Sequence, residues 1–229
     1  MIFEGIIEAF RLLFTFNKEI YEIIFLSLAL ALLSTVVASI FSIFFGITIS
    51  INTFKGKRLI KKLIFTFMGI PPVVMGLFVL LMLIGPFDGS NLLFTFQAMF
   101  IAQTLLVFPI ITGNIIISSE KTQKEVLETA TTLGASTKDK IYLVIKETKP
   151  FIFMSMILGF SRAISEVGAV MLVGGNIRYK TRVMTTFIAQ NNSMGEFEAS
   201  IAMGIILLLL AFIIHSLLSK FRSDFYDWY

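Results

Sequence analysis

Long apolar runs separated by short polar segments dominate this sequence. The longest run extends from Ile23 to Phe54 without a charged residue. A helix needs about 20 predominantly apolar residues to cross the hydrocarbon core of a bilayer, and five regions are predicted as spans. They lie at residues 23–50, 63–84, 93–117, 150–173 and 200–218. The pattern predicts an all-α, polytopic membrane protein with about five spans, forming a single transmembrane domain over residues 1–229.

The first 18 residues show a different pattern. Glu4, Glu8 and Arg11 share one face of a helix, and apolar side chains occupy the remainder. Such a pattern is typical of a helix that lies in the membrane interface, which is the prediction for residues 1–18. A signal peptide would require a basic start and a small-residue cleavage site, and the sequence has neither. A sixth span here would be short and would disturb the charge alternation of the loops.

Composition places most of the protein surface in contact with something other than water. Only 15% of the residues are charged, against about 25% in a typical soluble domain. Hydrophobic residues make up 56% of the chain, and its mean hydropathy is +0.88. Because the chain has no cysteine and a lone histidine, His215, neither disulfides nor a metal site are expected.

The basic residues are distributed unevenly among the loops. Most of the 19 Lys and Arg residues fall in residues 55–62, 121–149 and 220–222. These segments alternate with the predicted spans in such a way that all three lie on one side of the membrane. Because cytoplasmic loops carry the excess of Lys and Arg, we expect that side to be cytoplasmic. The N-terminus is then outside and the C-terminus inside.

The longest polar segment, residues 118–149, lies between the third and fourth predicted spans. It begins with a run of helix formers, and Gly134 then offers the left-handed backbone conformation that ends a helix. Ser136 followed by Asp139 matches a capping box that begins a second helix, and Pro150 marks the return into the membrane. We predict two short amphipathic helices joined at a glycine corner, forming a docking knob for a soluble partner. An ordinary solvated loop is the alternative.

Two triplets in this segment carry a family resemblance. Glu128-Thr129-Ala130 and Leu133-Gly134-Ala135 resemble the cytoplasmic EAA loop in the permease subunits of binding-protein-dependent ABC importers. In that family the loop inserts into a cleft on the ATP-binding subunit and transmits its closure. Thr129 departs from the usual alanine, and Lys149-Pro150 stands where the family usually has Leu-Pro. The resemblance implies coupling roles for Glu128, Ala130, Leu133, Gly134 and Ala135.

A second block, residues 161–169, resembles a segment of the molybdate, sulfate and tungstate permeases; residues 171–177 and 181–186 are most similar to the tungstate branch. The whole resemblance covers residues 20–218. It implies a type I ABC importer permease fold in the cell membrane of a prokaryote and transport of tungstate, with molybdate or sulfate as the alternatives. The implied partners are a second copy of the chain, two ATP-binding subunits and an extracytoplasmic substrate-binding protein. Because the chain has no GxxxxGK[ST] loop, we expect ATP and Mg on the ATPase and no cofactor on this chain.

Polar and kinking residues within the spans are the gate or pore candidates, namely Arg162, Ser165, Glu166, Pro71 and Pro72. Arg162 and Glu166 are four residues apart, so on a helix they share a face and can pair. An unpaired charge in mid-bilayer costs at least roughly 2.5–3.5 kcal/mol, which favours pairing. The pair either locks the fourth span against its neighbours or shapes the gate. Prolines kink helices, and the kinks at Pro71–Pro72 and Pro109 either line the path or are purely structural.

Three basic residues, Arg178, Lys180 and Arg182, follow the fourth span on the predicted outer side. We favour a role in docking the acidic rim of a binding protein. Steering of an anion and ordinary solvated loop charges are the alternatives.

Two other classes of protein remain as alternatives. A passive anion channel would conduct without ATP and would not need the docking knob. A membrane-anchored assembly factor would use the knob to recruit a soluble protein without transporting anything. An intramembrane enzyme is disfavoured because no carboxylates or histidines pair convincingly for acid–base catalysis. Membrane lipid is expected to surround the spans, and no nucleic-acid partner is expected.

Overall fold

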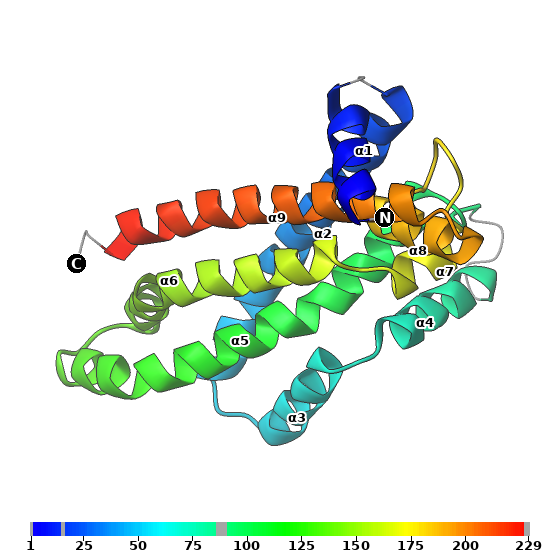
Figure 1. The fold of residues 1–229 in the computed structure, drawn as a ribbon. Coiled ribbons are helices and arrows are strands. Elements are labelled where there is room, and N and C mark those ends of the chain that lie inside the picture. The colour runs from blue at the N-terminus through cyan, green and yellow to red at the C-terminus, as the bar shows by residue number, and fades with distance from the viewer. Residues whose placement is uncertain (1, 15–16, 86–90, 227–229) are drawn as a thin grey trace.

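The computed structural model describes residues 2–14, 17–85 and 91–226, and every regular element within those ranges is an α-helix (Figure 1). The helices are α1 (Ile2–Phe14), α2 (Lys18–Ile51), α3 (Lys57–Met68), α4 (Pro72–Ile84), α5 (Phe96–Thr132), α6 (Thr137–Ile164), α7 (Gly168–Gly174), α8 (Met184–Met194) and α9 (Phe197–Tyr226). Figure 1 shows the turn between α5 and α6 at the same end of the molecule as the last turns of α9, with α7 and α8 at the other end. The predicted all-α class is confirmed.

Three helical segments are long and apolar enough to cross a membrane unaided: Lys18–Ile51, Phe96–Glu120 and Phe197–Leu217. Two bent helix pairs, α3 with α4 and α6 with α7, correspond to the second and fourth predicted spans. The first pair turns by 106° and the second by 57°. The five predicted regions are therefore helical, but two of them are broken rather than continuous.

The first break lies between α3 and α4. Its last residue, Pro71, has an extended backbone (φ −61°, ψ 132°). The ring of a proline excludes the residue before it from the helical region, and both Ile70 and Pro71 precede a proline. Pro72 then begins α4, where a missing backbone N–H leaves no hydrogen bond unmade. The kink predicted at Pro71–Pro72 is confirmed as a full break.

Neither Pro109 nor Pro150 interrupts its helix, because α5 continues through the first and α6 through the second. The prediction of two short helices in residues 118–149 is therefore wrong in extent, whereas the return into the membrane at Pro150 stays a prediction. The two halves of this polar segment are the end of α5 and the start of α6, and both helices continue into the predicted spans. A single proline removes one backbone hydrogen bond, and packing on both sides of it holds each helix together.

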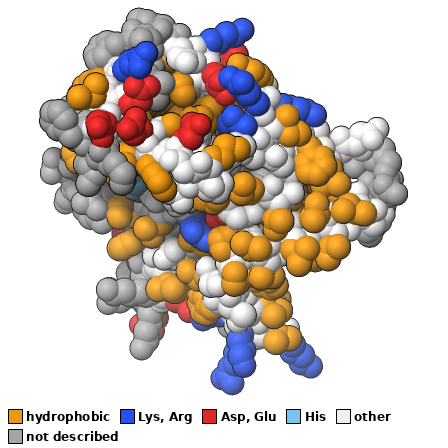
Figure 2. All heavy atoms as spheres, turned by 45° about the vertical axis from the view of Figure 1, so that its right-hand side comes forward, with side chains coloured by type: hydrophobic (Ala, Val, Ile, Leu, Met, Phe, Trp, Pro, Cys, Tyr) orange, Lys and Arg blue, Asp and Glu red, His pale blue; other side chains and the backbone are white. Residues whose placement is uncertain are grey.

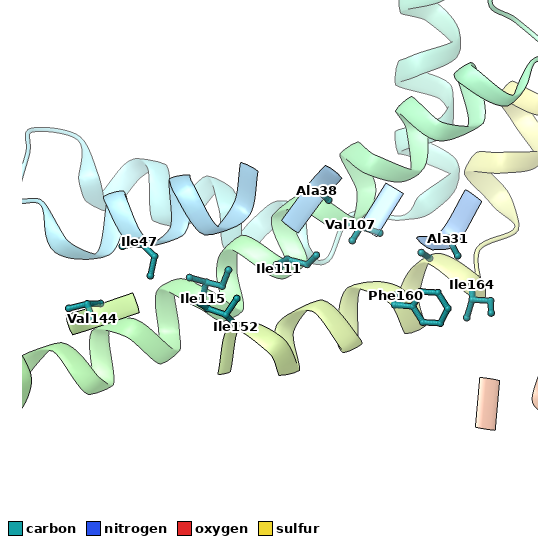
Figure 3. Packing of buried hydrophobic residues seen from close by; sticks show 11 residues of the cluster. Ala31, Ala38, Ile47, Val107, Ile111, Ile115, Val144, Ile152, Phe160 and Ile164 are labelled. Carbon is teal, nitrogen blue, oxygen red and sulfur yellow. The ribbon is translucent and has the colours of Figure 1, made fainter. Parts of the chain in front are cut away.

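The main hydrophobic core lies where α2, α5 and α6 meet (Figure 3). Ala31 and Ala38 of α2 are small, which allows the branched side chains of α5, such as Val107, to approach closely. Serine and threonine hydroxyls in these helices bond to backbone carbonyls of the preceding turn, which satisfies them away from water. Polar contacts also join α2 to α5: the Ser42 hydroxyl donates to the carbonyl of Phe108 (3.0 Å), and the Thr112 hydroxyl lies 2.9 Å from that of Ser42.

The N-terminal helix α1 packs against α9. A Cβ added to Gly5 would collide with Cγ2 of Ile201, so the two helices approach closely there. Ala9, on the same face of α1, is buried, whereas Ile7 and Phe10 on the other face are exposed. An exposed apolar face supports the interfacial position expected for residues 1–18, which stays a prediction. Residues 1, 15 and 16 lie outside the described residues.

Candidate functional site

The corner between α5 and α6 is built by the backbone around Gly134. Gly134 has a left-handed backbone conformation (φ +75°). Its N–H donates to the carbonyl of Thr131 (3.0 Å), and the N–H of Ala135 donates to the carbonyl of Ala130 (2.9 Å). These two bonds form a Schellman motif, which ends a helix with a glycine. A Cβ added to Gly134 would meet no atom within 4 Å, so glycine is required for its conformation and not for lack of space.

The second helix of the corner begins with the predicted capping box. The N–H of Asp139 donates to the Ser136 hydroxyl (3.3 Å), and the N–H of Ser136 donates to Oδ2 of Asp139 (3.0 Å). The hydrogen bonds from Ser136 hold the pKa of the Asp139 carboxyl below its ordinary value. Together with the Schellman motif, this box fixes the angle at which α6 leaves the corner.

The corner presents apolar surface away from the molecule. The Leu133 side chain is 81% exposed, and Tyr142 in the second turn of α6 is exposed as well. Of the other predicted coupling residues, Glu128 is exposed, Ala130 is buried and Ala135 is partly buried. This arrangement can insert an apolar knob, with a carboxylate beside it, into a complementary cleft of another protein.

The ion pair between Arg162 and Glu166 is present, with Nη2 3.6 Å from Oε2. The Glu166 side chain is buried, whereas that of Arg162 is 36% exposed. α6 ends at Ile164, so the pair spans the end of this helix and does not share one helix face as predicted. Oε1 of Glu166 also accepts a hydrogen bond from the N–H of Ala169 in the first turn of α7 (3.0 Å). A single carboxylate therefore joins the last turn of α6 to the first turn of α7.

The two helix breaks lie close together because α4 packs against α7. A Cβ added to Gly168 of α7 would lie 2.7 Å from Cγ2 of Val73 of α4. At the second break, the Ser165 hydroxyl donates to the carbonyl of Ser161 (2.9 Å), which covers an open carbonyl at the end of α6. The structure thus brings the gate candidates, including Pro71–Pro72, to one junction. Whether this junction lines a path stays a prediction.

The outer basic residues have a partner that the sequence did not indicate. Arg178 forms two charge-assisted hydrogen bonds to the Glu19 carboxylate, one of them from Nε to Oε1 (2.8 Å). Nη1 of Arg182 lies 3.4 Å from the same Oε1, and the carboxylate raises the pKa of the Arg178 guanidinium. Lys180 is exposed and has no side-chain partner among the described residues. Docking of a binding protein on these residues stays a prediction, and their pairing ties the α7–α8 loop to the start of α2.

Two further polar contacts between helices were not predicted from the sequence. Nε2 of Gln103 in α5 donates to the carbonyl of Ala163 in the last turn of α6 (2.8 Å). The Ser161 hydroxyl lies 2.8 Å from Nε2 of His215, which joins α6 to α9. A glutamine in an apolar span is the signal that could have found the first of them. Among the described residues, no three His, Asp or Glu side chains are grouped so that they could hold a metal ion.

Comparison with known proteins shows the family of this chain. The family model described as "Binding-protein-dependent transport system inner membrane component" matches residues 38–223. The chain belongs to this family. The chain is therefore a multi-pass inner-membrane permease component, as the resemblance implied.

Individual relatives cover nearly the whole chain. A tungstate uptake system permease protein, TupB, of Peptoclostridium acidaminophilum is 42% identical over 97% of this chain and 99% of its own length. TupB of Campylobacter jejuni is 30% identical over 96% of this chain and 93% of its own length. The sulfate transport system permease protein CysT of Escherichia coli is 30% identical, over 83% of this chain and 75% of its own length.

A solved structure supports the same architecture. The chain matches a structure of the MetNI methionine ABC transporter in an inward-facing conformation with a TM-score of 0.73. The match covers 90% of this chain and 94% of the other, at 13% sequence identity. The fold of this permease component is thus that of an ABC importer permease, and the predicted type I fold is confirmed.

Proposed function

We propose that the chain is the membrane subunit of an ATP-driven oxyanion importer, with tungstate as its substrate. Two relatives with tungstate uptake in their names align along almost its full length, at 42% and 30% identity. The sulfate relative covers less of the chain. Transport of molybdate or sulfate is the second candidate, since a sulfate permease is also among the relatives of this chain.

The corner between α5 and α6 is the observation that carries the coupling role. It holds an exposed Leu133 on two helices whose ends are fixed by a Schellman motif and a capping box. Because α5 and α6 continue from the corner into the membrane as single helices, a push on the knob moves the spans themselves. Glu128 and Gly134 are the residues that we assign to this coupling.

The proposed assembly contains two copies of this chain, two ATP-binding subunits and an extracytoplasmic binding protein. In this assembly ATP and Mg bind to the ATP-binding subunits, and the excess of basic residues supports a cytoplasmic position of the corner. Closure of the two ATP-binding subunits moves the paired knobs together and opens the path outward. The junction of Arg162 and Glu166 lies between α6 and α7, where such a movement alters the end of a span.

The substrate is tested by reconstitution of the chain with its ATPase and binding protein. ATP hydrolysis is measured against tungstate, molybdate and sulfate, and we expect the largest stimulation by tungstate. Equal or larger stimulation by molybdate or sulfate would reassign the substrate but keep the importer class. Tungstate flux through liposomes that contain this chain alone, without ATP, would instead favour a passive channel.

The coupling role is tested by the substitution Gly134→Glu. A residue other than glycine in the left-handed conformation costs about 1–2 kcal/mol. The substitution also adds a carboxylate to the corner, next to Leu133. We expect the chain to insert normally but to lose complex formation with the ATPase and the tungstate-stimulated hydrolysis.

The matched control is Gly195→Glu. Gly195 also has a positive φ (+82°), and a Cβ added to it would meet no atom within 4 Å, but it lies in the loop between α8 and α9. This variant carries the same conformational cost and the same charge, and we expect it to bind the ATPase normally. Uptake that survives Gly134→Glu would exclude the proposed coupling.

A further inference from the structure

Helix α3 has no buried residue among its 12 residues, although α2 and α4 on either side of it both have several. Four basic residues lie on one side of the helix, and these are Lys57, Arg58, Lys61 and Lys62. The other side carries exposed apolar residues, and these are Leu59, Ile60, Leu63 and Phe67. A helix with one basic face and one apolar face is typical of a helix that lies in a membrane interface.

One edge of the basic side is held by α5. Nζ of Lys61 lies 2.5 Å from Oε2 of Glu120, and Nζ of Lys57 lies 3.9 Å from Oε1 of the same carboxylate. At the far end of α3, a Cβ added to Gly113 of α5 would collide with Sδ of Met68. α3 is therefore fixed to the protein along one edge, and its remaining surface is open.

The other two cations of α3 are not held in this way. Arg58 and Lys62 are both exposed, and neither side chain has a partner among the described residues. Together with Lys61, Phe65 and Thr66 they line a shallow hollow on the protein surface. Arg58 and Lys62 are one helical turn apart and lie beside the ring of Phe65. They can therefore bind an anionic group that carries an apolar tail.

The position of α3 along the bundle fits such a ligand. The apolar part of α2 ends at Ile51 and that of α5 ends at Glu120, so the contact of α3 with Glu120 lies where these two helices leave the membrane. The 106° turn at the first break directs α3 away from the axis of α4. Figure 2 shows basic side chains projecting at the lower edge of the molecule, the level of α3 in Figure 1, with hydrophobic side chains above them.

We infer that α3 is a binding site for anionic phospholipid, with the headgroup phosphate held by Arg58 and Lys62 and the acyl chains lying along Leu59, Leu63 and Phe67. Basic residues next to a membrane surface attract anionic headgroups, and their long apolar stems allow the charge to reach the headgroup level. A second copy of the chain is a poorer occupant, because a symmetric contact of α3 with α3 would bring like charges together. This site does not depend on the proposed transport function.

The test is a native mass spectrometry titration of the purified full-length chain with phosphatidylglycerol or phosphatidylcholine. We expect the native chain to bind phosphatidylglycerol more tightly. A basic residue near an anionic surface contributes roughly fivefold in affinity, so Arg58→Gln with Lys62→Gln should weaken phosphatidylglycerol binding on the order of 20-fold. Binding of phosphatidylcholine should not change. The exchange variant Arg58→Lys with Lys62→Arg keeps both charges and should keep most of the preference.

The matched control is Lys138→Gln with Lys146→Gln, which removes two exposed basic residues of α6 and gives the same net charge. This control should bind phosphatidylglycerol like the native chain, and melting temperatures of all variants verify folding. Equal losses in both double variants would show a general charge effect and overturn the site. Unchanged binding after loss of Arg58 and Lys62 would also overturn it. Displacement of the lipid by soluble tungstate would show an oxyanion site instead.

Discussion

Each of the two helix breaks divides a predicted span into two helices, but the breaks arise by different means. At the break between α3 and α4, two consecutive prolines exclude the helical backbone, so a straight helix is forbidden there. At the break between α6 and α7 no proline is present, and the Glu166 carboxylate forms an ion pair with Arg162 on one side and accepts a hydrogen bond from the N–H of Ala169 on the other. The prolines destabilise a continuous helix at the first break, whereas Glu166 stabilises the broken conformation at the second. The second break is therefore the one that can change when charges or contacts change.

The two breaks are also joined to each other. Each produces a short helix, and these helices, α4 and α7, pack together through small residues. A Cβ added to Gly76 of α4 would lie 2.7 Å from the backbone Cα of Ala169 in α7, and one added to Gly168 would lie 2.7 Å from the side-chain Cγ2 of Val73. Close helix contact through small residues is a common way to associate helices in a membrane. A movement at the Glu166 break must therefore move α4 as well.

The largest effect is expected from Glu166→Ala, which removes support from the second break. Arg162 loses its ion-pair partner and α7 loses the acceptor for its Ala169 N–H. Removal of one partner from a buried pair typically costs 3–5 kcal/mol, and because Arg162 is partly exposed we expect about 3 kcal/mol. The free energy of unfolding in detergent measures this loss, and tungstate-stimulated ATP hydrolysis should fall with it.

Two further variants separate the charge from the hydrogen bond. Glu166→Gln keeps an acceptor for Ala169 and should lose less stability than Glu166→Ala. The double variant Arg162→Gln with Glu166→Ala leaves no unpaired cation and should recover part of the loss. The single variant Arg162→Gln completes the comparison. If the double variant loses as much unfolding free energy as Arg162→Gln and Glu166→Ala lose in sum, the two side chains do not stabilise each other.

An intermediate effect is expected from Gly76→Ala, which acts on the contact between the two breaks. The new Cβ would meet backbone atoms of Ala169, which cannot move aside as a side chain can. Overpacking of this kind costs typically 1–3 kcal/mol, and we expect about 2 kcal/mol. The unfolding midpoint in detergent measures the change.

The matched control for this substitution is Gly204→Ala. Gly204 lies within α9, and a Cβ added there would meet no atom within 4 Å. Alanine favours a helix over glycine by about 1 kcal/mol, so this variant should be as stable as the native chain or more so. If both alanine variants change stability alike, close packing of α4 on α7 is not the cause.

The sequence predicted the first break better than the second for a physical reason. Consecutive prolines at Pro71–Pro72 act through their own backbone, so their effect is local and readable. The end of α6 depends on Glu166, Ala169 and Gln103, which meet only in the folded chain. Likewise the Gly134 corner and its capping box are local and were predicted, whereas the bonds of Glu19 to Arg178 join residues far apart in sequence.

Single prolines show the limit of local rules. Pro109 and Pro150 have the same chemistry as Pro72, yet α5 and α6 run through them because their packing on α2 and on each other outweighs one lost hydrogen bond. The sequence could not supply that packing. It therefore located the polar segment 118–149 correctly but divided it into separate short helices.

The smallest effect is expected from the double substitution Pro71→Ala with Pro72→Ala. It removes the restriction on the backbone but leaves the contacts on both sides, with α3 held by Glu120 and α4 held by α7. Loss of each proline costs about 0.4–1 kcal/mol, mainly through greater freedom of the unfolded chain, so we expect about 1–2 kcal/mol for the pair. Because the chain has no cysteine, single cysteines at Leu63 and Leu81 can carry spin labels. A straight helix would separate these positions by about 27 Å, and we expect the measured distance to remain as short as in the native chain. A distance that lengthens to the straight-helix value would mean that the prolines alone maintain the bend, and that the contacts of α3 with Glu120 and of α4 with α7 are too weak to hold it.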